Sequence, residues 1–303
     1  MITVLLLSPS LDVTYLVNEV AVGEIHRPHT VLRSPGGKGL NLARAAHRLG
    51  VSASVVMPSG GHIGALVSEL AAAEGVAVTT VPVRQQTRSC VTAIDGLGLT
   101  EFYEPAPDLS ATEQSQLCAA LAAEPAGGWT ALSGSIPAAV DTQLLIGALA
   151  ARAAQGDSIA IDTHGPVLGL LASELKPALV KVNRHEAAEL LGADASAASL
   201  AAQLRTITGG TVIVTDGVAG SVGIDGTGTW SARLDAPAGR YPVGSGDSYL
   251  AGILATLSRG GSLAAALAIA SGAASANAAV AGAATLDPAL AAHLAERVVI
   301  NSA

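Results

Sequence analysis

Short apolar segments alternate with longer segments of helical hydrophobic spacing along most of this chain, and this alternation limits its fold more than any other feature. Apolar runs bounded by turn residues are typical of strands buried on both faces, whereas amphipathic stretches of ten or more residues are typical of helices. Strands that alternate with helices form βαβ units, in which helices cover both faces of a parallel sheet. The sequence therefore predicts an α/β fold with three layers, α/β/α, around a mostly parallel central sheet.

The elements that this pattern predicts follow one another along the chain. The expected strands are residues 2–7, 53–57, 129–132, 158–161, 178–182, 211–214, 221–224 and 229–232. The expected helices are residues 40–49, 63–73, 110–123, 141–154, 184–191, 197–206, 248–257, 262–280 and 288–298. Because the 303 residues form one such series without a linker-like segment, we expect a single domain over residues 1–303.

Two segments interrupt this series, and both alternate apolar with polar residues as half-exposed strands do. They cover residues 13–32 and 88–104, and Gly and Pro punctuate them. We expect them to pair in space as a small β-element beside the main sheet, contributed by about residues 12–33 and 87–105. Such an element can act as a lid that excludes water from a bound ligand, and it offers a surface for a homodimer. The alternative is two surface excursions without function.

The composition excludes several classes of protein. The net charge is −8 and no basic tract of useful length occurs, so neither a nucleic acid nor a membrane surface is an expected partner. The apolar start at residues 1–7 is too short to span a bilayer, and polar residues within the Ala-rich run 263–284 favour a buried soluble helix. The two distant cysteines, Cys90 and Cys118, form neither a disulfide framework nor a metal-binding spacing, which favours a cytoplasmic location.

A glycine-rich turn precedes the predicted helix 248–257. Its residues are Gly244, Ser245 and Gly246, and Asp247 follows them. Such a turn leaves backbone N–H groups pointing one way, which suits phosphate oxygens. A carboxylate beside a phosphoryl group can accept the proton of an attacking hydroxyl. We therefore interpret Asp247 as a general base and the three N–H groups as an anion hole for the transferring group. The alternative for this Asp is a helix N-cap, which needs no ligand.

A second glycine-rich turn precedes the first predicted helix. Gly36, Gly37 and Gly39 surround Lys38, and Asn41 follows. Glycines allow a ligand to approach the backbone closely, Lys38 adds a positive point charge, and an Asn side chain both donates and accepts hydrogen bonds. The spacing differs from that of a Walker A loop, so this turn alone does not identify the ligand.

Taken together, these segments resemble the ribokinase/PfkB family of carbohydrate kinases. Residues 36–41 are similar to the first signature of that family, and residues 244–252 are similar to the second. Further similar segments are residues 8–12 (the sugar-binding segment), Asn183 with Glu186 (the N-x-x-E element) and residues 215–220 (the T-x-G-x-x-G nucleotide segment). The resemblance covers nearly the whole chain. It implies a ribokinase-like fold with a β-strand lid, and phosphoryl transfer from ATP to a sugar.

Within that family the chain is most similar to kinases of phosphorylated ketohexoses, namely 1-phosphofructokinase and tagatose-6-phosphate kinase. Lys38, the pair 87–88 and the segment 132–137 are among the residues that carry this similarity. It implies ATP-dependent phosphorylation of fructose 1-phosphate or tagatose 6-phosphate to a bisphosphate and ADP. One alternative is a kinase of the same fold that acts on an unphosphorylated sugar or a nucleoside, with Lys38 and Arg88 merely structural. Another is a ligand-binding protein that keeps the fold without catalysis.

The same resemblance implies roles for residues that contact the sugar. Asp12 is expected to accept hydrogen bonds from two sugar hydroxyls, because a carboxylate at the carboxyl end of a strand suits a vicinal diol. The alternative for Asp12 is stabilisation of a turn. Gly37 and Asn41 are expected to add contacts to the sugar.

A kinase that acts on a sugar phosphate needs cations for the phosphate already present, whereas a kinase of a neutral sugar does not. Lys38 and Arg88, together with Arg27, are the candidates. Both arginines lie in the lid segments, so closure of the lid would bring them over the substrate. For Arg27 the alternative is solvated surface charge. Ser135 either donates to the same phosphate or only ends a strand.

The resemblance also implies the nucleotide and metal sites. Asn183 and Glu186 are implied to organise Mg²⁺ through water, although their spacing is also that of a capping box, and both roles can hold at once. The residues implied to bind the nucleotide are Thr215, Gly217 and Gly220 beside ATP, and Asn277 facing the adenine. An Asn on a buried helix can also serve only to satisfy a backbone group. A K⁺ site near residues 282–285 is implied as well.

Overall fold

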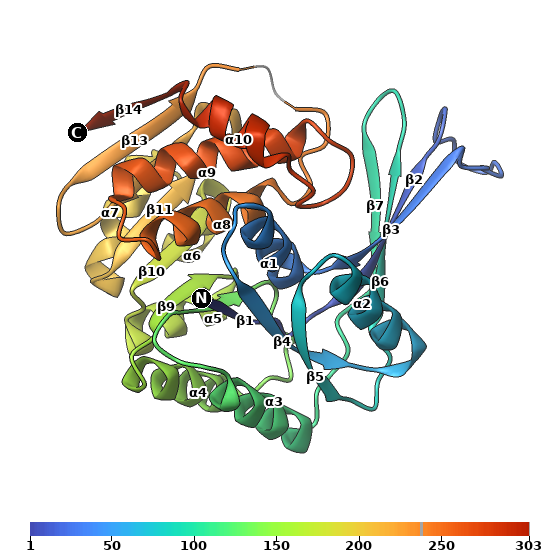
Figure 1. Ribbon diagram of the computed structural model, residues 1–303, viewed down its shortest axis with the longest axis horizontal. Helices are drawn as coiled ribbons and strands as arrows, with labels where there is room; N and C mark the ends of the chain where they lie inside the picture. Colours follow the sequence, from blue (N-terminus) through green and yellow to red (C-terminus); the bar gives the residue numbers. More distant parts are fainter. Residues whose placement is uncertain (237–238, 303) are drawn as a thin grey trace.

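A ten-stranded sheet forms the middle layer of the protein (Figure 1). The computed structural model describes residues 1–236 and 239–302. The strand order is β14-β13-β12-β11-β10-β9-β8-β1-β4-β5. Strands β1, β4, β5 and β8 to β11 are parallel, and β12, β13 and β14 continue the sheet as antiparallel strands at one edge. The strands are β1 (Ile2–Leu5), β4 (Ala53–Ser59), β5 (Ala77–Pro82), β8 (Trp129–Ser133), β9 (Ser158–Asp162), β10 (Leu179–Asn183), β11 (Thr211–Thr215), β12 (Ser221–Ile224), β13 (Thr229–Leu234) and β14 (Val298–Ser302). The expected mostly parallel α/β fold is confirmed.

Helices cover both faces of this sheet. One layer contains α1 (Lys38–Arg48), α2 (Gly61–Ala73), α8 (Ser245–Leu257), α9 (Leu263–Ala278) and α10 (Pro288–Ala295). The other contains α3 (Ala111–Ala123), α4 (Thr142–Ala154), α5 (Pro166–Leu170), α6 (Arg184–Leu191) and α7 (Ala197–Thr208). Successive side chains of a strand point to opposite faces. In β1, accordingly, Ile2 and Val4 join the core on the first face, whereas Leu5 joins the core on the second.

The Ala-rich segment near the C-terminus forms a buried helix, as expected, because its small side chains let two helices approach closely. A Cβ on Gly252 of α8 would lie 2.6 Å from the Cα of Ala270 of α9. Larger residues at this crossing would force the helices apart. Within residues 1–236 and 239–302, none of the helices combines the length and the hydropathy needed to cross a bilayer.

A second sheet stands beside the first, and we call it the lid. Its strands are β2 (Ser10–Leu16), β3 (Thr30–Gly36), β6 (Arg88–Ile94) and β7 (Leu99–Tyr103), in the order β3-β2-β6-β7. The expected pairing between the two interrupting segments is confirmed, since β2 and β6 are parallel partners from the pair of Ser10 and Arg88 onward. Each segment also folds back on itself as an antiparallel hairpin, β2–β3 and β6–β7. In Figure 1 the lid projects from one side of the main body.

The C-terminal prediction requires a correction. A helix was expected over residues 288–298, but α10 ends at Ala295 and β14 begins at Val298. The β-branched residues of β14 pair antiparallel with β13, whose chain position is some sixty residues earlier. Strand β5 and helix α5 were also not predicted from the sequence. Both β5 and β14 are exposed edge strands without a long apolar run, so their local signal is weak.

The strand order reverses at β1, which has β8 on one side and β4 on the other. From β1 the chain continues to β4 and β5 on one side, and then crosses to β8 on the other side of β1. In open α/β sheets, ligands bind outside the carboxyl ends of the strands at such a reversal. The segments that follow β1 and β8 therefore meet at one place, and the lid strand β2 begins there.

Candidate active site

A cavity of about 570 Å³, which we call the main cavity, lies at these carboxyl ends between the body and the lid. It brings together both glycine-rich turns, although about two hundred residues separate them in the chain. The lid contributes Asp12, Arg88, Cys90 and Tyr103 to its wall. The predicted residues that line it are Asp12, Gly37, Lys38, Asn41, Arg88, Ser135, Asn183, Glu186, Thr215, Gly244, Gly246 and Asp247.

Asp247 lies in the first turn of α8 with its carboxylate at the wall of the main cavity, and it is only 5% exposed. The N-cap of α8 is Gly244, and no side chain caps this helix, so the N-cap alternative for Asp247 is wrong. Asn41 Nδ2 donates a hydrogen bond of 2.8 Å to Asp247 Oδ2. Burial raises the pKa of Asp247 to about 6, although the charge of Lys38 opposes this rise. The carboxylate is therefore ionised at neutral pH and can accept a proton.

The turn before Asp247 packs too closely against its surroundings for a larger residue. Gly244 has a φ of 79°, and a Cβ there would lie 2.7 Å from the backbone nitrogen of Ala284. The N–H of Ser245 donates to the carbonyl of Pro242 at 3.1 Å. This bond removes Ser245 N–H from the predicted anion hole, which leaves Gly244 and Gly246 as the candidates in the turn.

Two lysines close to Asp247 share one buried carboxylate, and one of them, Lys181, has its Nζ 3.2 Å from where a Cβ on Gly246 would lie. Asp162, at the end of β9, has no exposed surface. Its Oδ1 lies 3.3 Å from Lys38 Nζ, and its Oδ2 lies 2.9 Å from Lys181 Nζ. Burial raises the pKa of this carboxyl, but the two lysines outweigh that effect and hold the pKa below its ordinary value. Asp162 in turn raises the pKa of Lys38. The network therefore keeps positive charge gathered at the cavity wall.

Of the two lid arginines predicted to bind the substrate phosphate, one lines the main cavity and the other does not. Arg88 lines the main cavity, and its Nη1 donates to the carbonyl of Glu104 at 3.0 Å. Its buried Nε makes no hydrogen bond within the part of the chain that the structure describes. Arg27 is exposed and does not line the cavity. The hairpin register pairs Leu16 with Thr30, so the loop between them, which carries Arg27, lies beyond the outer end of the lid strands (Figure 1).

Asp12 occupies the lid side of the main cavity. Ser10 Oγ donates a hydrogen bond of 2.6 Å to Asp12 Oδ1. Burial raises the pKa of Asp12, against the lowering effects of the Ser10 hydrogen bond and of the positive charges of Arg44 and Arg88. The carboxylate lies directly over Gly36, where a Cβ would overlap it. The Ser8 hydroxyl also faces this cavity and is buried with no partner in the described chain.

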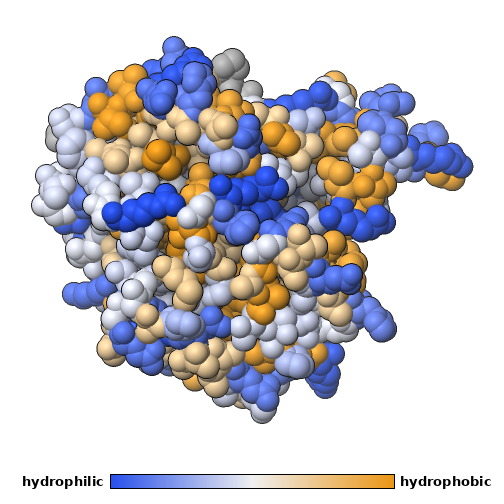
Figure 2. All heavy atoms as spheres, viewed as in Figure 1, coloured by the Kyte–Doolittle hydropathy of each residue, from blue (hydrophilic) through white to orange (hydrophobic). Residues whose placement is uncertain are grey.

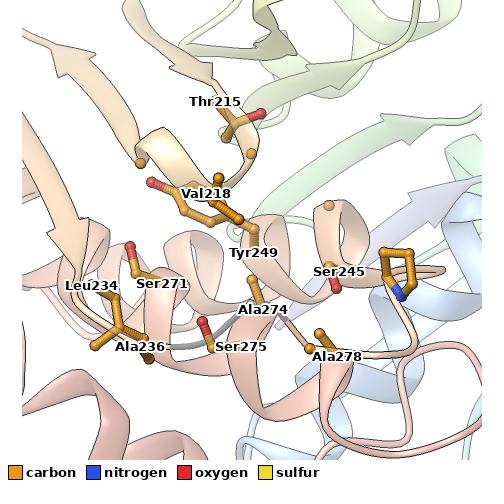
Figure 3. A pocket seen from close by; sticks show the side chains of 15 residues that line it. Thr215, Val218, Leu234, Ala236, Ser245, Tyr249, Ser271, Ala274, Ser275 and Ala278 are labelled. Atoms are coloured by element: carbon orange, nitrogen blue, oxygen red, sulfur yellow. The ribbon is translucent and has the colours of Figure 1, made fainter.

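A second cavity of about 280 Å³, which we call the small cavity, is shown in Figure 3. It adjoins the main cavity. Thr215 and Gly246 line both cavities. The predicted residues Gly217, Gly220 and Ser245 line the small cavity as well. Its walls also include Val218, Leu234, Tyr249, Ser271, Ala274, Ser275 and Ala278. These walls carry no charge, and a flat aromatic base fits such an apolar surface.

Asn277 does not line either cavity, so its predicted contact with adenine needs correction. It is fully buried, and its Nδ2 donates to the carbonyl of Val243 at 2.8 Å and to Ser245 Oγ at 3.0 Å. The structure thus places Asn277 beneath the glycine-rich turn, in the alternative role of satisfying a backbone group.

Asn183 and Glu186 form the capping box of α6. Asn183 Oδ1 accepts from the N–H of Glu186, and Glu186 Oε2 accepts from the N–H of Asn183, both at 2.8 Å. The other oxygen of Glu186 lies 3.7 Å from Lys38 Nζ. Both side chains also line the main cavity. Their oxygen atoms fit Mg²⁺, which is typically held by one or two carboxylates together with substrate phosphates and retained waters. In the described residues, no cluster of three or more His, Cys, Asp or Glu side chains is arranged to hold a metal ion.

Several residues of the site escaped the sequence analysis. Asp162 closes an apolar strand and His164 follows it, so the carboxyl-end rule for parallel sheets could have found both. Lys181 interrupts an apolar strand, which is the signal of a buried charge that needs a partner. Tyr103 of β7 carried no signal, because only the folding of the lid brings it to the main cavity.

Comparisons with known proteins bear on this geometry. The family model for pfkB family carbohydrate kinases matches residues 8–290. Phosphofructokinase-2 from Escherichia coli, solved in complex with fructose-6-phosphate, is 25% identical, with a TM-score of 0.88 over 97% of this chain and 98% of that chain. The same Escherichia coli protein in complex with potassium gives a TM-score of 0.91 at the same identity and coverage. A possible 1-phosphofructokinase from Thermotoga maritima is 20% identical, with a TM-score of 0.86 over 100% of this chain and 99% of that chain, and at this identity shows the fold alone.

Proposed function

This chain belongs to the pfkB family of carbohydrate kinases, and we propose that it phosphorylates a phosphorylated ketohexose. The substrate would be fructose 1-phosphate or tagatose 6-phosphate, and the products a bisphosphate and ADP. The observation that carries this proposal is the main cavity, which is lined by the buried carboxylate of Asp247 together with the cationic side chains of Lys38, Lys181 and Arg88. These cations would bind the phosphate group that the sugar substrate already carries.

Asp247 would act as the general base. Its raised pKa of about 6 lies close to the working pH, where a base is most effective. It would take the proton of the sugar hydroxyl as that oxygen attacks the γ-phosphorus of ATP and the bond to the leaving ADP oxygen breaks. The N–H groups of Gly244 and Gly246 would stabilise the charge on the transferring group. The adjoining small cavity would hold the adenosine.

The charge of the main cavity supports a substrate that already carries phosphate. Lys38, Lys181 and Arg88 line the wall, and the buried Nε of Arg88 has no partner within the described residues. A guanidinium with a free donor is suited to a phosphate oxygen. Ser135 lies on the same wall and would add a donor. The complex of the Escherichia coli phosphofructokinase-2 with fructose-6-phosphate agrees with a sugar phosphate as the class of substrate.

A second candidate is a kinase of an unphosphorylated sugar or a nucleoside. The observation that favours it is the pairing of Lys38, whose Nζ lies 3.3 Å from Asp162 and 3.7 Å from Glu186. In this reading the charge of Lys38 is already compensated and serves only the structure. The two candidates differ in what Lys38 and Arg88 do for substrate affinity.

An ADP-release screen with Mg²⁺ tests the proposal. The acceptors are fructose 1-phosphate, tagatose 6-phosphate, fructose 6-phosphate, fructose, ribose and adenosine. Turnover with one of the first two is expected. Turnover confined to the neutral acceptors would establish the second candidate, and ATP binding without turnover on any acceptor would indicate an inactive binding protein.

Substitutions then separate the roles of the cations. Lys38→Met and Arg88→Met should each raise KM for the sugar phosphate by about 10-fold or more, since a hydrogen bond to a charged group contributes roughly 1.5–3 kcal/mol. Their KM for ATP should change little. Arg27→Met is the matched control, because this exposed arginine lies in the lid but outside the cavity. Unchanged KM values in both cavity variants would contradict the role of these cations.

We also propose the ions that accompany ATP. Asn183 and Glu186 would hold Mg²⁺ through water, and the ion would neutralise part of the phosphate charge. For K⁺, the carbonyl oxygens of Ala281 and Gly282 lie 3.3 Å from the hydroxyl oxygen of Thr285, and such oxygen donors suit this ion. Comparing rates in potassium and tetramethylammonium chloride tests the K⁺ site, which predicts a higher rate in potassium.

The lid offers a surface for a second copy of the chain. Its exposed apolar side chains include Leu97 and Phe102, which are 94% and 65% exposed. Figure 2 shows hydrophobic surface on this projecting part of the molecule. We expect a homodimer through the lid, and Phe102→Lys should convert it to a monomer in sedimentation velocity. A wild-type protein that sediments as a monomer at micromolar concentration would contradict this expectation.

A further inference from the structure

One arginine behind the candidate base is completely enclosed, although no role has been assigned to it. Arg44 of α1 is 1% exposed. Its Nη1 donates to Asn41 Oδ1 at 3.0 Å and to the carbonyl of Ala283 at 2.6 Å. Its Nη2 donates to the carbonyl of Pro35, and its Nε donates to Glu74. A guanidinium has no acceptor, so all of these contacts have it as the donor.

This fact determines the orientation of the neighbouring amide. An Asn side chain presents an acceptor on one side and donors on the other. Because Arg44 can only donate, the oxygen of Asn41 must face it, and the Nδ2 must then face away. That Nδ2 meets Asp247 Oδ2 at 2.8 Å. With the amide reversed, an oxygen would stand against the carboxylate and Nδ2 against the guanidinium, so both contacts would become repulsive.

The chain of contacts therefore runs from a buried cation to the carboxylate at the cavity. Asn41, which is 5% exposed, lies between them. One oxygen of Asp247 is held by the amide, and the other is left to receive the hydroxyl proton of a substrate. Arg44 also joins the end of lid strand β3, through Pro35, to the loop after α9, through Ala283.

We propose that Arg44 is a positioning residue for phosphoryl transfer: by setting the orientation of the Asn41 amide, it holds Asp247 ready as the base. This inference rests on the proposed function of Asp247. Arg44 touches neither cavity in the structure, and it acts only through Asn41.

Other charged groups near Asn41 and Asp247 also influence the pKa of Asp247, and their influence must be distinguished from that of Arg44. Lys38, Asp162 and Lys181 surround Asp247. Glu74, the C-cap residue of α2, forms an ion pair with Arg44, and the charge of Arg44 has a lowering effect on the pKa of Asp12 of β2. Replacing Arg44 leaves the first three groups in place. A change in the titration of Asp247 in such a variant therefore reports on the amide.

The test is the titration of the Asp247 carboxyl carbon by NMR in the protein without substrates, with the signal assigned by its absence in Asp247→Asn. In Arg44→Met the amide loses its fixed orientation, so the pKa of Asp247 should rise by about one unit, the order expected for a weakened hydrogen bond to a charge. Arg44→Lys keeps the charge but not the fork of donors, and it should show most of the same rise. Arg48→Met is the matched control, since Arg48 is an exposed arginine on the same helix. It should titrate as the wild type.

Kinetics provide the second readout. In Arg44→Met, the acid limb of the pH profile of kcat/KM should move to higher pH by the same amount as the NMR pKa. At pH 6.5 kcat should fall by about 3-fold, because a rise in the pKa of Asp247 from about 6 to about 7 lowers its ionised fraction from about three quarters to about one quarter. This is less than the loss expected on removing the base itself. KM for ATP should stay unchanged, which a general loss of structure would not produce.

An unchanged Asp247 pKa in a folded Arg44→Met overturns the proposal. If that variant does not fold, hydrogen exchange in the wild-type protein provides the test. The side-chain amide protons of Asn41 should exchange slowly with solvent, as buried and hydrogen-bonded donors do. Exchange at the rate of a free amide would then overturn it. A wild-type enzyme that phosphorylates no sugar phosphate would contradict the proposed substrate only. The proposal for Arg44 would still be tested, because neither NMR measurement needs a substrate.

Discussion

Replacing Asp247 by Asn should remove activity and at the same time stabilise the folded protein. Burial raises the pKa of this carboxyl from its ordinary 3.8 to about 6. A shift of about two units corresponds to about 3 kcal/mol between the protonated and ionised forms. Because the folded-state pKa is raised, this stability is present below pH 3.8 and is lost as the pH rises through 6. At neutral pH the ionised base therefore opposes folding, and a neutral Asn avoids that opposition.

Urea unfolding at two pH values measures this effect. At pH 8 the free energy of unfolding of Asp247→Asn should exceed that of the wild type by up to about 3 kcal/mol, and near pH 4 the two should be nearly equal. Asp194→Asn is the control, because Asp194 forms an ion pair with Arg184 while its side chain is 89% exposed. An exposed pair of this kind contributes less than about 1 kcal/mol at any pH.

An ADP-release assay on the same proteins measures the chemistry. Asp247→Asn should lower kcat by at least ~10²-fold, the low end for a positioned base. In the wild type, kcat/KM should fall below about pH 6 as the carboxylate is protonated. A folded Asp247→Asn with nearly normal kcat, or one that is less stable than the wild type at pH 8, would refute the reasoning.

Three further changes test other parts of the structure. Gly36→Ala should raise KM for the sugar substrate about 10-fold or more with a smaller effect on kcat, since the new Cβ displaces the Asp12 carboxylate and its bonds to a hydroxyl; an unchanged KM would exclude Asp12 as a sugar ligand. Arg152→Met should lower the free energy of unfolding by about 3–5 kcal/mol, because it leaves the buried partner Asp157 unpaired; urea unfolding measures this, and a loss under 1 kcal/mol would contradict it. Gly244→Ala should reduce kcat at least ~10-fold in steady-state assays, because its φ of 79° suits glycine and the added Cβ meets the loop after α9; normal kcat would show that the turn need not be rigid.

The fold was predictable wherever a strand is buried on both faces. Strands β8, β9, β11 and β12 lie within a residue of their predicted ranges, because a short apolar run between turn residues is a local signal. The edge strands β5 and β14 carry no such run, and their pairing partners are distant in the chain. The predicted helix over residues 288–298 therefore ran past the end of α10 to the first residue of β14.

Predictions for the candidate site divide in the same way. The glycine-rich turns are local patterns, and the turn at Gly244 has the positive φ that glycine allows. The position of Arg27 was not predictable, since it depends on the direction in which a hairpin extends. Asn277 likewise depends on which face of a helix lies beneath a turn. The residues that neighbour Arg27 and Asn277 in the sequence determine neither the direction of the hairpin nor the face of the helix.

The amino-acid sequence by itself determined the α/β layering, the two glycine-rich turns and the kinds of group that they present, because these depend on residues close together in the chain. Tertiary structure alone decided that Asn41 meets Asp247, that Lys38 and Lys181 share Asp162, and that Arg44 stands behind them. The physical reason is that hydrogen bonds and charge interactions depend on distances in space. Burial and these contacts also set the proton affinity of Asp247, and only the meeting of distant strands and helices creates them.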